Sequence, residues 1–307
     1  MAIKLNRIDI HHHIIPPEYL SSLATIGVTS VDGVSFPKWD IESSLTFMDR
    51  QGITAAITSI SAPGIYFGDS DFAQDLARRC NEFSANLVNK YPQRFGAFAS
   101  LPLPSVKKSL LELEYALDTL NLDGVALLSN INGKYIGDPK FSDLFSELNR
   151  RKAVVLIHPN SPPSDKQPMP NFNAAVLEYV FDTTRAVANL IHGSTIKKYP
   201  DIRFILSHAG GTVPYIAWRI SFGKKKLIDY LKRFYYDTAV SSTSYALRSL
   251  QELVDPSQIL FGSDYPFLPE RAASVMIEGF DNYDGFDTET RMAIAYKNAL
   301  ALFPRFI

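Results

Sequence analysis

The chain has 307 residues, 46% of them hydrophobic, and a formal net charge of −1. That charge gives no electrostatic reason to expect binding to nucleic acid or to an anionic membrane surface, and no apolar run approaches the roughly 20 residues that a membrane span needs. The single cysteine, Cys80, cannot form an internal disulfide, and the first residues lack the pattern of a signal peptide, so we expect a cytoplasmic protein.

Short apolar runs alternate with longer amphipathic stretches along the whole chain. The runs are apolar on both faces, as in parallel strands that are covered on both sides. Eight expected strands span 7–13, 54–60, 94–100, 122–129, 153–158, 203–208, 233–239 and 258–264, with helical patterns between them at, for example, 106–120, 140–152 and 175–199. Eight such units, without a glycine-rich phosphate loop, predict an α/β protein that forms one closed (β/α)8 TIM barrel, a single domain over residues 1–307.

Two connections between the expected strands are long. About 40 residues separate the first strand from the second, and the insert at 14–39 is a candidate lid over the strand ends. The segment SPPSDKQPMPNFN, 161–173, follows the fifth strand and is a second candidate. Long loops inside a compact domain are often functional, so both segments are predicted to cover the site.

Four of the six histidines fall at the ends of expected strands. His11 and His13 end the first strand, His158 ends the fifth and His208 ends the sixth, while Asp264 ends the eighth. Enzymes with this barrel carry their chemistry at the carboxyl ends of the strands. We therefore expect these five side chains to meet around one rim.

The other histidines are predicted to be structural. Alternation along a strand places Asp9, His11 and His13 on one face and turns His12 to the other. His192 lies inside an expected helix, away from the rim. Neither His12 nor His192 is expected to take part in chemistry.

Imidazole nitrogens and a carboxylate oxygen suit zinc, manganese or iron better than calcium or magnesium. His11, His13, His158 and Asp264 are therefore predicted to hold one divalent metal ion, with Zn²⁺ as the first choice and Mn²⁺ or Fe²⁺ as alternatives. Three nitrogens and one oxygen leave room for water or substrate, as a catalytic metal requires. His208 is then a spare imidazole beside the metal, placed to transfer a proton.

Several segments together resemble the amidohydrolase superfamily, and within it the branch of aminocarboxymuconate-semialdehyde decarboxylase and the ortho-hydroxybenzoate, or salicylate-type, decarboxylases. The matching segments are IDIHHHIIP at 8–16, LIHP at 156–159, YPDIRFILSHAGGTVPYIAWRI at 199–220, YYDTA at 235–239 and ILFGSDYPF at 259–267. The resemblance implies the same metal ligands, His208 as the acid–base residue, and a single metal ion. Asp264 is, from its place beside His208, the other residue that could handle the proton. The resemblance also implies a homodimer, with local support from the apolar end ALALFPRFI.

The resemblance implies a metal-dependent, non-oxidative decarboxylase of a small aromatic or unsaturated carboxylic acid, either hydroxybenzoate-like or muconate-semialdehyde-like. The segment SFPK before Trp39 and Asp40 contains no arginine, where the muconate-semialdehyde enzyme grips a carboxylate. A salicylate with an apolar ring substituent is therefore an attractive substrate. Four aromatic side chains are candidate walls for the ring: Trp39, Phe172, Phe181 and Phe267.

Two other functions remain open from the residues alone. The same five side chains could serve a metal-dependent hydrolase that acts on a lactone, an amide or a carbon–carbon bond, with His208 as the base. A barrel that binds metal without catalysis is a third possibility. The complete ligand set with an extra histidine beside it argues against that third possibility.

Overall fold

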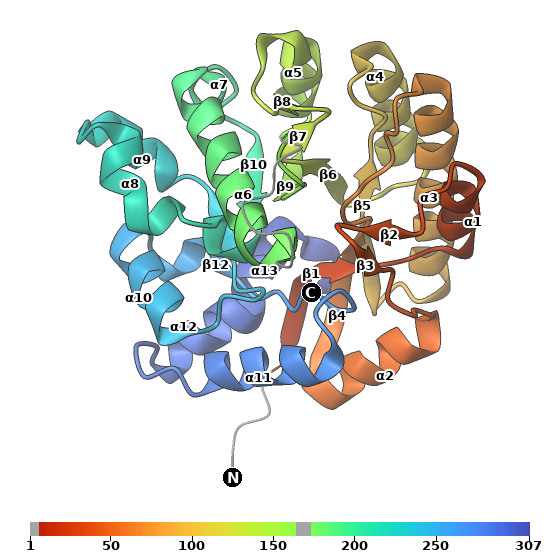
Figure 1. The fold of residues 1–307 in the computed structure, drawn as a ribbon. Coiled ribbons are helices and arrows are strands. Elements are labelled where there is room, and N and C mark those ends of the chain that lie inside the picture. The colour runs from red at the N-terminus through yellow and green to blue at the C-terminus, as the bar shows by residue number, and fades with distance from the viewer. Residues whose placement is uncertain (1–5, 164–172) are drawn as a thin grey trace.

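The computed structural model describes residues 6–163 and 173–307, and eight parallel strands form a barrel at its centre (Figure 1). Each of the eight expected strands is present, and their order around the barrel follows the sequence. The strands are β1 (Arg7–His13), β4 (Ile53–Ser59), β5 (Phe95–Ser100), β6 (Gly124–Leu128), β9 (Val154–His158), β10 (Arg203–Leu206), β11 (Tyr235–Asp237) and β12 (Ile259–Leu260). The prediction of a (β/α)8 barrel is confirmed.

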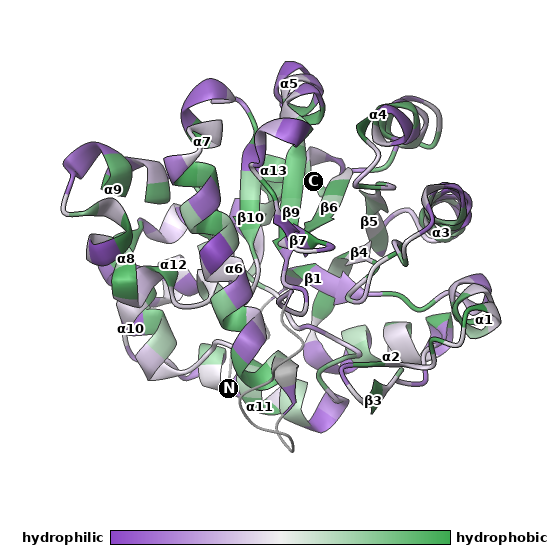
Figure 2. Ribbon diagram, turned by 45° about the horizontal axis from the view of Figure 1, so that its top comes forward, coloured by the Kyte–Doolittle hydropathy of each residue, from purple (hydrophilic) through white to green (hydrophobic). Residues whose placement is uncertain are grey.

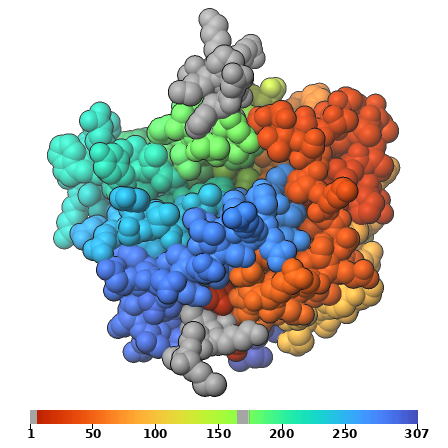
Figure 3. Space-filling model, turned by 60° about the horizontal axis from the view of Figure 1, so that its bottom comes forward, coloured from red at the N-terminus to blue at the C-terminus, as the bar shows by residue number. Residues whose placement is uncertain are grey.

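The barrel closes where the chain leaves β12 and passes β1. The backbone N–H of Ile10 donates to the carbonyl of Phe261 (3.0 Å), and that of His13 donates to the carbonyl of Tyr265 (2.7 Å). The N–H of Asp264 donates in turn to the carbonyl of His11 (2.8 Å). The first and last parts of the chain accordingly lie side by side on the surface in Figure 3. Closure therefore brings the histidines of the first strand next to the aspartate that follows the last.

Helices surround the barrel, and they carry polar and apolar residues in alternation, whereas the central strands are mostly apolar (Figure 2). The 106–120 pattern forms a helix that continues as a π-helical turn, Tyr115–Thr119, and the 175–199 pattern forms two helices, α6 and α7. The helices are α1 (Pro17–Thr25), α2 (Ile41–Gln51), α3 (Ser70–Lys90), α4 (Val106–Glu114), α5 (Ser142–Arg150), α6 (Ala174–His192), α7 (Thr195–Lys198), α8 (Val213–Ser221), α9 (Lys225–Leu231), α10 (Ser244–Leu253), α11 (Glu270–Asp281), α12 (Thr288–Met292) and α13 (Asn298–Leu302). None of the helices in the described ranges is both long and apolar enough to cross a membrane.

The end of the chain packs into the barrel interior. Leu302, Phe303 and Phe306 are buried in one cluster with inward-facing strand residues such as Ile8 and Leu156. Phe303 also meets the ring of Phe98 edge-on, with ring centroids 5.8 Å apart. The apolar side chains of the C-terminal segment are thus buried against residues of their own chain. These buried side chains give no local support for a dimer interface, and the homodimer stays a prediction.

The insert that follows β1 has regular secondary structure and is hydrogen-bonded to residues on the opposite side of the barrel. It contains α1 and a hairpin of β2 (Ser30–Val31) and β3 (Val34–Ser35). At the hairpin tip the carboxylate of Asp32 accepts hydrogen bonds from the hydroxyl of Tyr179 on α6 (2.7 Å) and from the hydroxyl of Ser161. A lid role for 14–39 stays a prediction. Most of the second candidate, 161–173, lies outside the described residues.

Candidate metal centre

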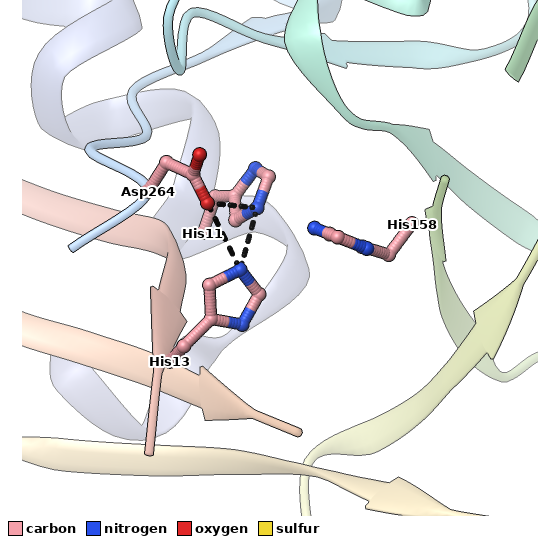
Figure 4. A group of neighbouring side chains, drawn as sticks. All are labelled: His11, His13, His158 and Asp264. Atoms are coloured by element: carbon pink, nitrogen blue, oxygen red, sulfur yellow. Dashed lines mark hydrogen bonds and ion pairs between the residues drawn. The ribbon is translucent and has the colours of Figure 1, made fainter. Parts of the chain in front are cut away.

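Four predicted ligands converge at the carboxyl ends of the strands (Figure 4). One nitrogen or oxygen atom from each of His11, His13, His158 and Asp264 lies within 4.8 Å of the others. The Nε2 atoms of His11 and His13 are 3.0 Å apart. Oδ1 of Asp264 is 3.0 Å from Nε2 of His13 and 3.2 Å from Nε2 of His11. The sequence therefore identified a set of side chains that the fold brings together from three separate segments.

The outer nitrogens of the three histidines all face hydrogen-bond acceptors. Nδ1 of His11 lies 2.7 Å from a carboxylate oxygen of Asp237. Nδ1 of His13 lies 3.3 Å from the carbonyl of Ser59, and Nδ1 of His158 lies 2.8 Å from the carbonyl of Pro159. A carboxylate or a carbonyl can only accept, so the rings of His11 and His158 carry a proton on Nδ1. Nδ1 of His13 also lies 3.1 Å from the hydroxyl of Ser59, which can either donate or accept. A proton on Nδ1 leaves Nε2 to face a metal, the arrangement found around metal-binding imidazoles.

This donor set fits a divalent cation. Two neutral Nε2 lone pairs at 3.0 Å repel each other unless a positive charge lies between them. Ligand atoms about 2.1 Å from a common metal are about 3 Å apart when they subtend a right angle. This is the spacing among His11, His13 and Asp264, whereas His158 lies farther off, within the 4.8 Å that spans the whole set. Three nitrogens and one carboxylate oxygen suit zinc, manganese and iron. Ligation by these four residues stays a prediction, which the geometry supports.

The electrostatics of the centre also favour one positive charge. Burial opposes a charge on His11, but the carboxylates of Asp237 and Asp264 outweigh it and raise the pKa of His11 to about 10. Burial lowers the pKa of His13, and burial with the neighbouring imidazoles holds the pKa of His158 well below its ordinary value. Despite burial, His11 keeps the pKa of Asp264 well below its usual range. Without a metal ion, the centre therefore carries one positive charge, on His11, at the place where a cation fits.

Metal uptake should release this proton. His11, with a pKa of about 10, is charged in the metal-free protein at pH 7.5, and a metal that binds its Nε2 must displace the proton. We expect about one proton released per ion bound, and affinity that increases as the pH rises toward 10. Calorimetric titration with Mn²⁺ in buffers of different ionisation enthalpy measures the release. Uptake without proton release would contradict the charged state assigned to His11.

His208 lies beside the cluster and has a free nitrogen. Its Nε2 is 3.5 Å from Oδ2 of Asp264, and its Nδ1 is buried without a hydrogen-bond partner among the described residues. The residue itself adopts a left-handed conformation (φ 55°) and is separated from the end of β10 by Ser207. Strained backbone of this kind is concentrated at functional sites. An imidazole held there with an unused nitrogen is placed to exchange a proton with a bound molecule.

Close packing leaves no room for a side chain at the two glycines that follow Ala209. A Cβ on Gly211 would lie 2.1 Å from the carbonyl oxygen of Val180, and a Cβ on Gly210 would lie 2.6 Å from the ring of Tyr236. Both residues also have positive φ. The turn after His208 is therefore closely packed against α6 and β11.

Asp9 does not join the rim, so the strict alternation predicted for the first strand is wrong. The pairing of β1 with β4 shifts by one residue between Asp9 and His12, which breaks the alternation of faces. The carboxylate of Asp9 instead contacts Nδ1 of His12 (3.1 Å) and accepts from Ser263, and Nε2 of His12 lies 2.6 Å from the hydroxyl of Ser44. All of these side chains are buried. His12 is structural, as predicted.

His192 also has a structural contact. Its Nε2 lies 2.8 Å from the carbonyl oxygen of Ile220 at the end of α8. Its ring packs against Phe222, with centroids 5.4 Å apart. These contacts join α6 to α8, in agreement with the prediction.

The four aromatic candidates for the substrate site fall in different places. The ring of Phe267 meets His13 edge-on at 5.4 Å, so it borders the cluster. Trp39 packs against Phe83 of α3 instead (6.0 Å). Phe181 is on α6 and is 38% exposed, and Phe172 lies outside the described residues. Of the four, Phe267 has a contact with a predicted ligand.

A small, largely apolar cavity of about 60 Å³ is lined by residues at and after the ends of β4, β5 and β6. Its walls include Ile60, Leu101, Ala126 and Leu128. Leu128 is paired in register with His158, and Ile60 follows Ser59, the residue that contacts Nδ1 of His13. The cavity therefore lies near the strand ends that carry two of the predicted ligands, although its walls contain none of them.

Asp237 and Tyr179 border the site and were not singled out from the sequence. Asp237 is the last residue of β11, a position similar to that of Asp264 after β12. The rule that selected carboxylates at strand ends could therefore have identified Asp237. Tyr179 is buried on α6, and its ring centroid lies 6.4 Å from that of His158. Nothing in its helical pattern distinguishes it from a core residue.

Comparison with known proteins is consistent with this geometry. A model of the family described as Amidohydrolase matches residues 8–305. The 6-methylsalicylic acid decarboxylase of Penicillium expansum is 34% identical, covering 97% of this chain and 96% of that protein. A solved structure described as an amidohydrolase II is 30% identical with a TM-score of 0.93, covering 97% of this chain and 100% of that one. A dihydroxybenzoic acid decarboxylase from Polaromonas, solved with manganese and the inhibitor 2-nitroresorcinol, shares the fold (TM-score 0.81, 24% identity, 98% and 97% covered).

Proposed function

The chain belongs to the amidohydrolase family, and we propose that it is a metal-dependent decarboxylase that removes CO₂ from an aromatic carboxylic acid with an ortho-hydroxyl group. The convergence of three Nε2 atoms and one carboxylate beside a spare imidazole carries the proposal. A relative that covers nearly the whole chain is a 6-methylsalicylic acid decarboxylase. Related hydroxybenzoate decarboxylases share the barrel.

The reaction replaces the carboxylate of the ring with a proton. His11, His13, His158 and Asp264 would hold a divalent ion, which would supply positive charge that favours the ionised form of the ortho-hydroxyl. His208 donates a proton to the carbon that carries the carboxylate. The bond from that carbon to the carboxylate then breaks, CO₂ leaves, and the bonding electrons return to the ring. The buried position of His208 excludes water, which would otherwise compete for the proton.

We propose Zn²⁺ as the first ion to test, with Mn²⁺ and Fe²⁺ after it. The donor set accepts all three. The Polaromonas relative carries manganese, which makes Mn²⁺ the alternative with direct support from a related protein.

We further propose a cytoplasmic location, because the one cysteine, Cys80, is buried and free and the fold needs no disulfide.

The apolar cavity suits a small substituent on the substrate ring. A cavity of about 60 Å³ holds roughly two waters, or a group such as a methyl. Ala126→Val adds two carbons to its wall. We expect this variant to lose about 10-fold or more in kcat/KM for 6-methylsalicylate, the scale of a filled apolar subsite, and to keep its rate on unsubstituted salicylate. Equal losses on both acids would place the methyl group elsewhere.

We propose that the protein is a homodimer that uses the outer face of α8 and α10. Tyr215, Trp218, Phe222 and Tyr245 are each at least 70% exposed there, and exposed aromatic patches of this kind mark protein interfaces. We expect sedimentation to show a dimer, and Trp218→Glu to shift it toward the monomer. A wild-type monomer at micromolar concentration would contradict this proposal.

A panel of substrates tests the function and its main alternative together. Salicylates, dihydroxybenzoates and unsaturated carboxylic acids are assayed for CO₂ release, and lactones and amides are assayed for hydrolysis, with the metal-loaded protein in each case. We expect CO₂ from at least one ortho-hydroxy acid. Turnover of a lactone or an amide without CO₂ from any acid would favour the hydrolase.

A further inference from the structure

Asp237 contacts both a predicted metal ligand and the backbone of the predicted acid–base residue. Its Oδ2 lies 2.7 Å from Nδ1 of His11. Its Oδ1 accepts from the backbone N–H groups of His208 (2.8 Å) and Ala239 (3.0 Å). The side chain is fully buried. Both oxygens of one carboxylate are therefore used, and all three partners are donors.

Each of these contacts constrains a different part of the site. The contact with Nδ1 holds the proton of His11 on that atom and turns Nε2 toward His13 and Asp264. The contact with the N–H of His208 anchors the turn after β10, where His208 (φ 55°) and Ala209 (φ 54°) are left-handed. Left-handed backbone is unfavourable for residues other than glycine. Such a turn therefore needs fixed hydrogen bonds to persist.

The surrounding packing leaves this pair little freedom. A Cβ on Gly262 would lie 2.8 Å from Cβ of His11 and 3.3 Å from Cβ of Asp237. The backbone that follows β12 thus passes directly against both side chains. His11 and Asp237 are held in one arrangement rather than in several.

We infer that Asp237 is a positioning residue that aligns His11 with the metal and His208 with the substrate at the same time. The inference rests on the proposed metal centre and adds a residue to it. Asp237 acts through its two partners, so it is not assigned a contact with substrate. One carboxylate then sets the relative position of a metal ligand and a proton donor that lie far apart in the chain.

An isosteric amide cannot replace this carboxylate. In Asp237→Asn, an amide oxygen that faces His208 and Ala239 turns its NH₂ group toward His11. The NH₂ group then donates to Nδ1 and moves the ring proton to Nε2, where it blocks metal binding. With the amide reversed, two backbone N–H groups face another donor. Either orientation loses one function of Asp237, although the shape of the side chain is unchanged.

The experiment compares Asp237→Asn with Asp123→Asn. Asp123 is a matched control because it is also largely buried and accepts a backbone N–H, that of Ala97 (2.8 Å), but it pairs with Arg305 and has no contact with the predicted ligands. Zn²⁺ and Mn²⁺ dissociation constants are measured by competition with a chelator. We expect affinity to fall about 10–100-fold in Asp237→Asn and to stay within about twofold of wild type in Asp123→Asn. Unchanged affinity in Asp237→Asn, or equal losses in both variants, would overturn the inference.

A second measurement needs neither folding of the variant nor a bound metal. Proton–nitrogen NMR of the wild-type protein should show a slowly exchanging Nδ1–H of His11, shifted downfield by its bond to a carboxylate, in the metal-free and metal-loaded forms alike. Its absence from both forms would overturn the inference even if the protein binds metal. If the resonance is present and no metal binds, the positioning contact stands and the proposed metal centre fails.

Discussion

The His158→Ala variant is expected to lose its metal and its activity together. His158 is the predicted ligand that belongs to β9, and it lies opposite the histidines of β1 and Asp264 (Figure 4). Its removal leaves two imidazoles and one carboxylate, so we expect metal affinity to fall by more than the factor of about 100 that marks the upper range for outer partners of a ligand. Metal content by atomic spectroscopy and turnover should fall in proportion.

His192→Ala is the matched control for this experiment. It removes an imidazole whose contacts are with the carbonyl of Ile220 and the ring of Phe222, and it should keep both metal and activity. Full metal occupancy and full activity in His158→Ala would show that the ligand assignment is wrong. Lost activity with full occupancy would instead assign His158 to the substrate.

The His208→Ala variant should have the opposite signature. Its imidazole is beside the cluster, with Nε2 3.5 Å from Asp264 and Nδ1 without a partner among the described residues, so no ligand position depends on it. We expect the metal to be retained and the rate to fall on the order of 10²–10⁴-fold, the usual contribution of a general acid or base. Single-turnover rates on metal-loaded protein provide the measurement. Metal loss in proportion to activity would make His208 a ligand.

The meeting of these residues follows largely from where their strands end, which the sequence pattern reveals. In a parallel barrel the carboxyl ends of all strands share one rim, so the sequence alone was enough to place histidines from the ends of three strands together. Closure of the ring then brings His11 beside Asp264 through the backbone bond between them (2.8 Å). Asp264 itself has φ 61°, a conformation that strand patterns do not reveal.

Features that depend on local irregularity or on tertiary packing were not predicted. The register shift in β1 directs Asp9 to His12 rather than to the rim, because strict alternation holds only for a regular strand. The hairpin of β7 (Asn130–Ile131) and β8 (Lys134–Tyr135) turns at Asn132 and Gly133, both with positive φ. This Asn-Gly pair is a local hairpin signal that was overlooked.

Two further expectations depended on apolar residues alone. Apolar residues identify a surface that must be covered, but they do not identify what covers it. Phe303 and Phe306 pack into the barrel of their own chain, and Trp39 packs against a helix. Side chains with a hydrogen-bonding role at a strand end were predicted more reliably, because the barrel determines where each strand ends.

The proposed reaction exchanges a carboxylate for a proton on an aromatic ring, and the product formed in deuterated water distinguishes it from every alternative. Metal-loaded protein is supplied with 6-methylsalicylate or the best acid from the panel in D₂O, and CO₂ and the ring product are quantified by mass spectrometry and NMR. We predict one CO₂ per product and one deuterium at the carbon that carried the carboxylate, with both lost in His208→Ala. Product without CO₂, or with oxygen from water at that carbon, would contradict decarboxylation at this centre.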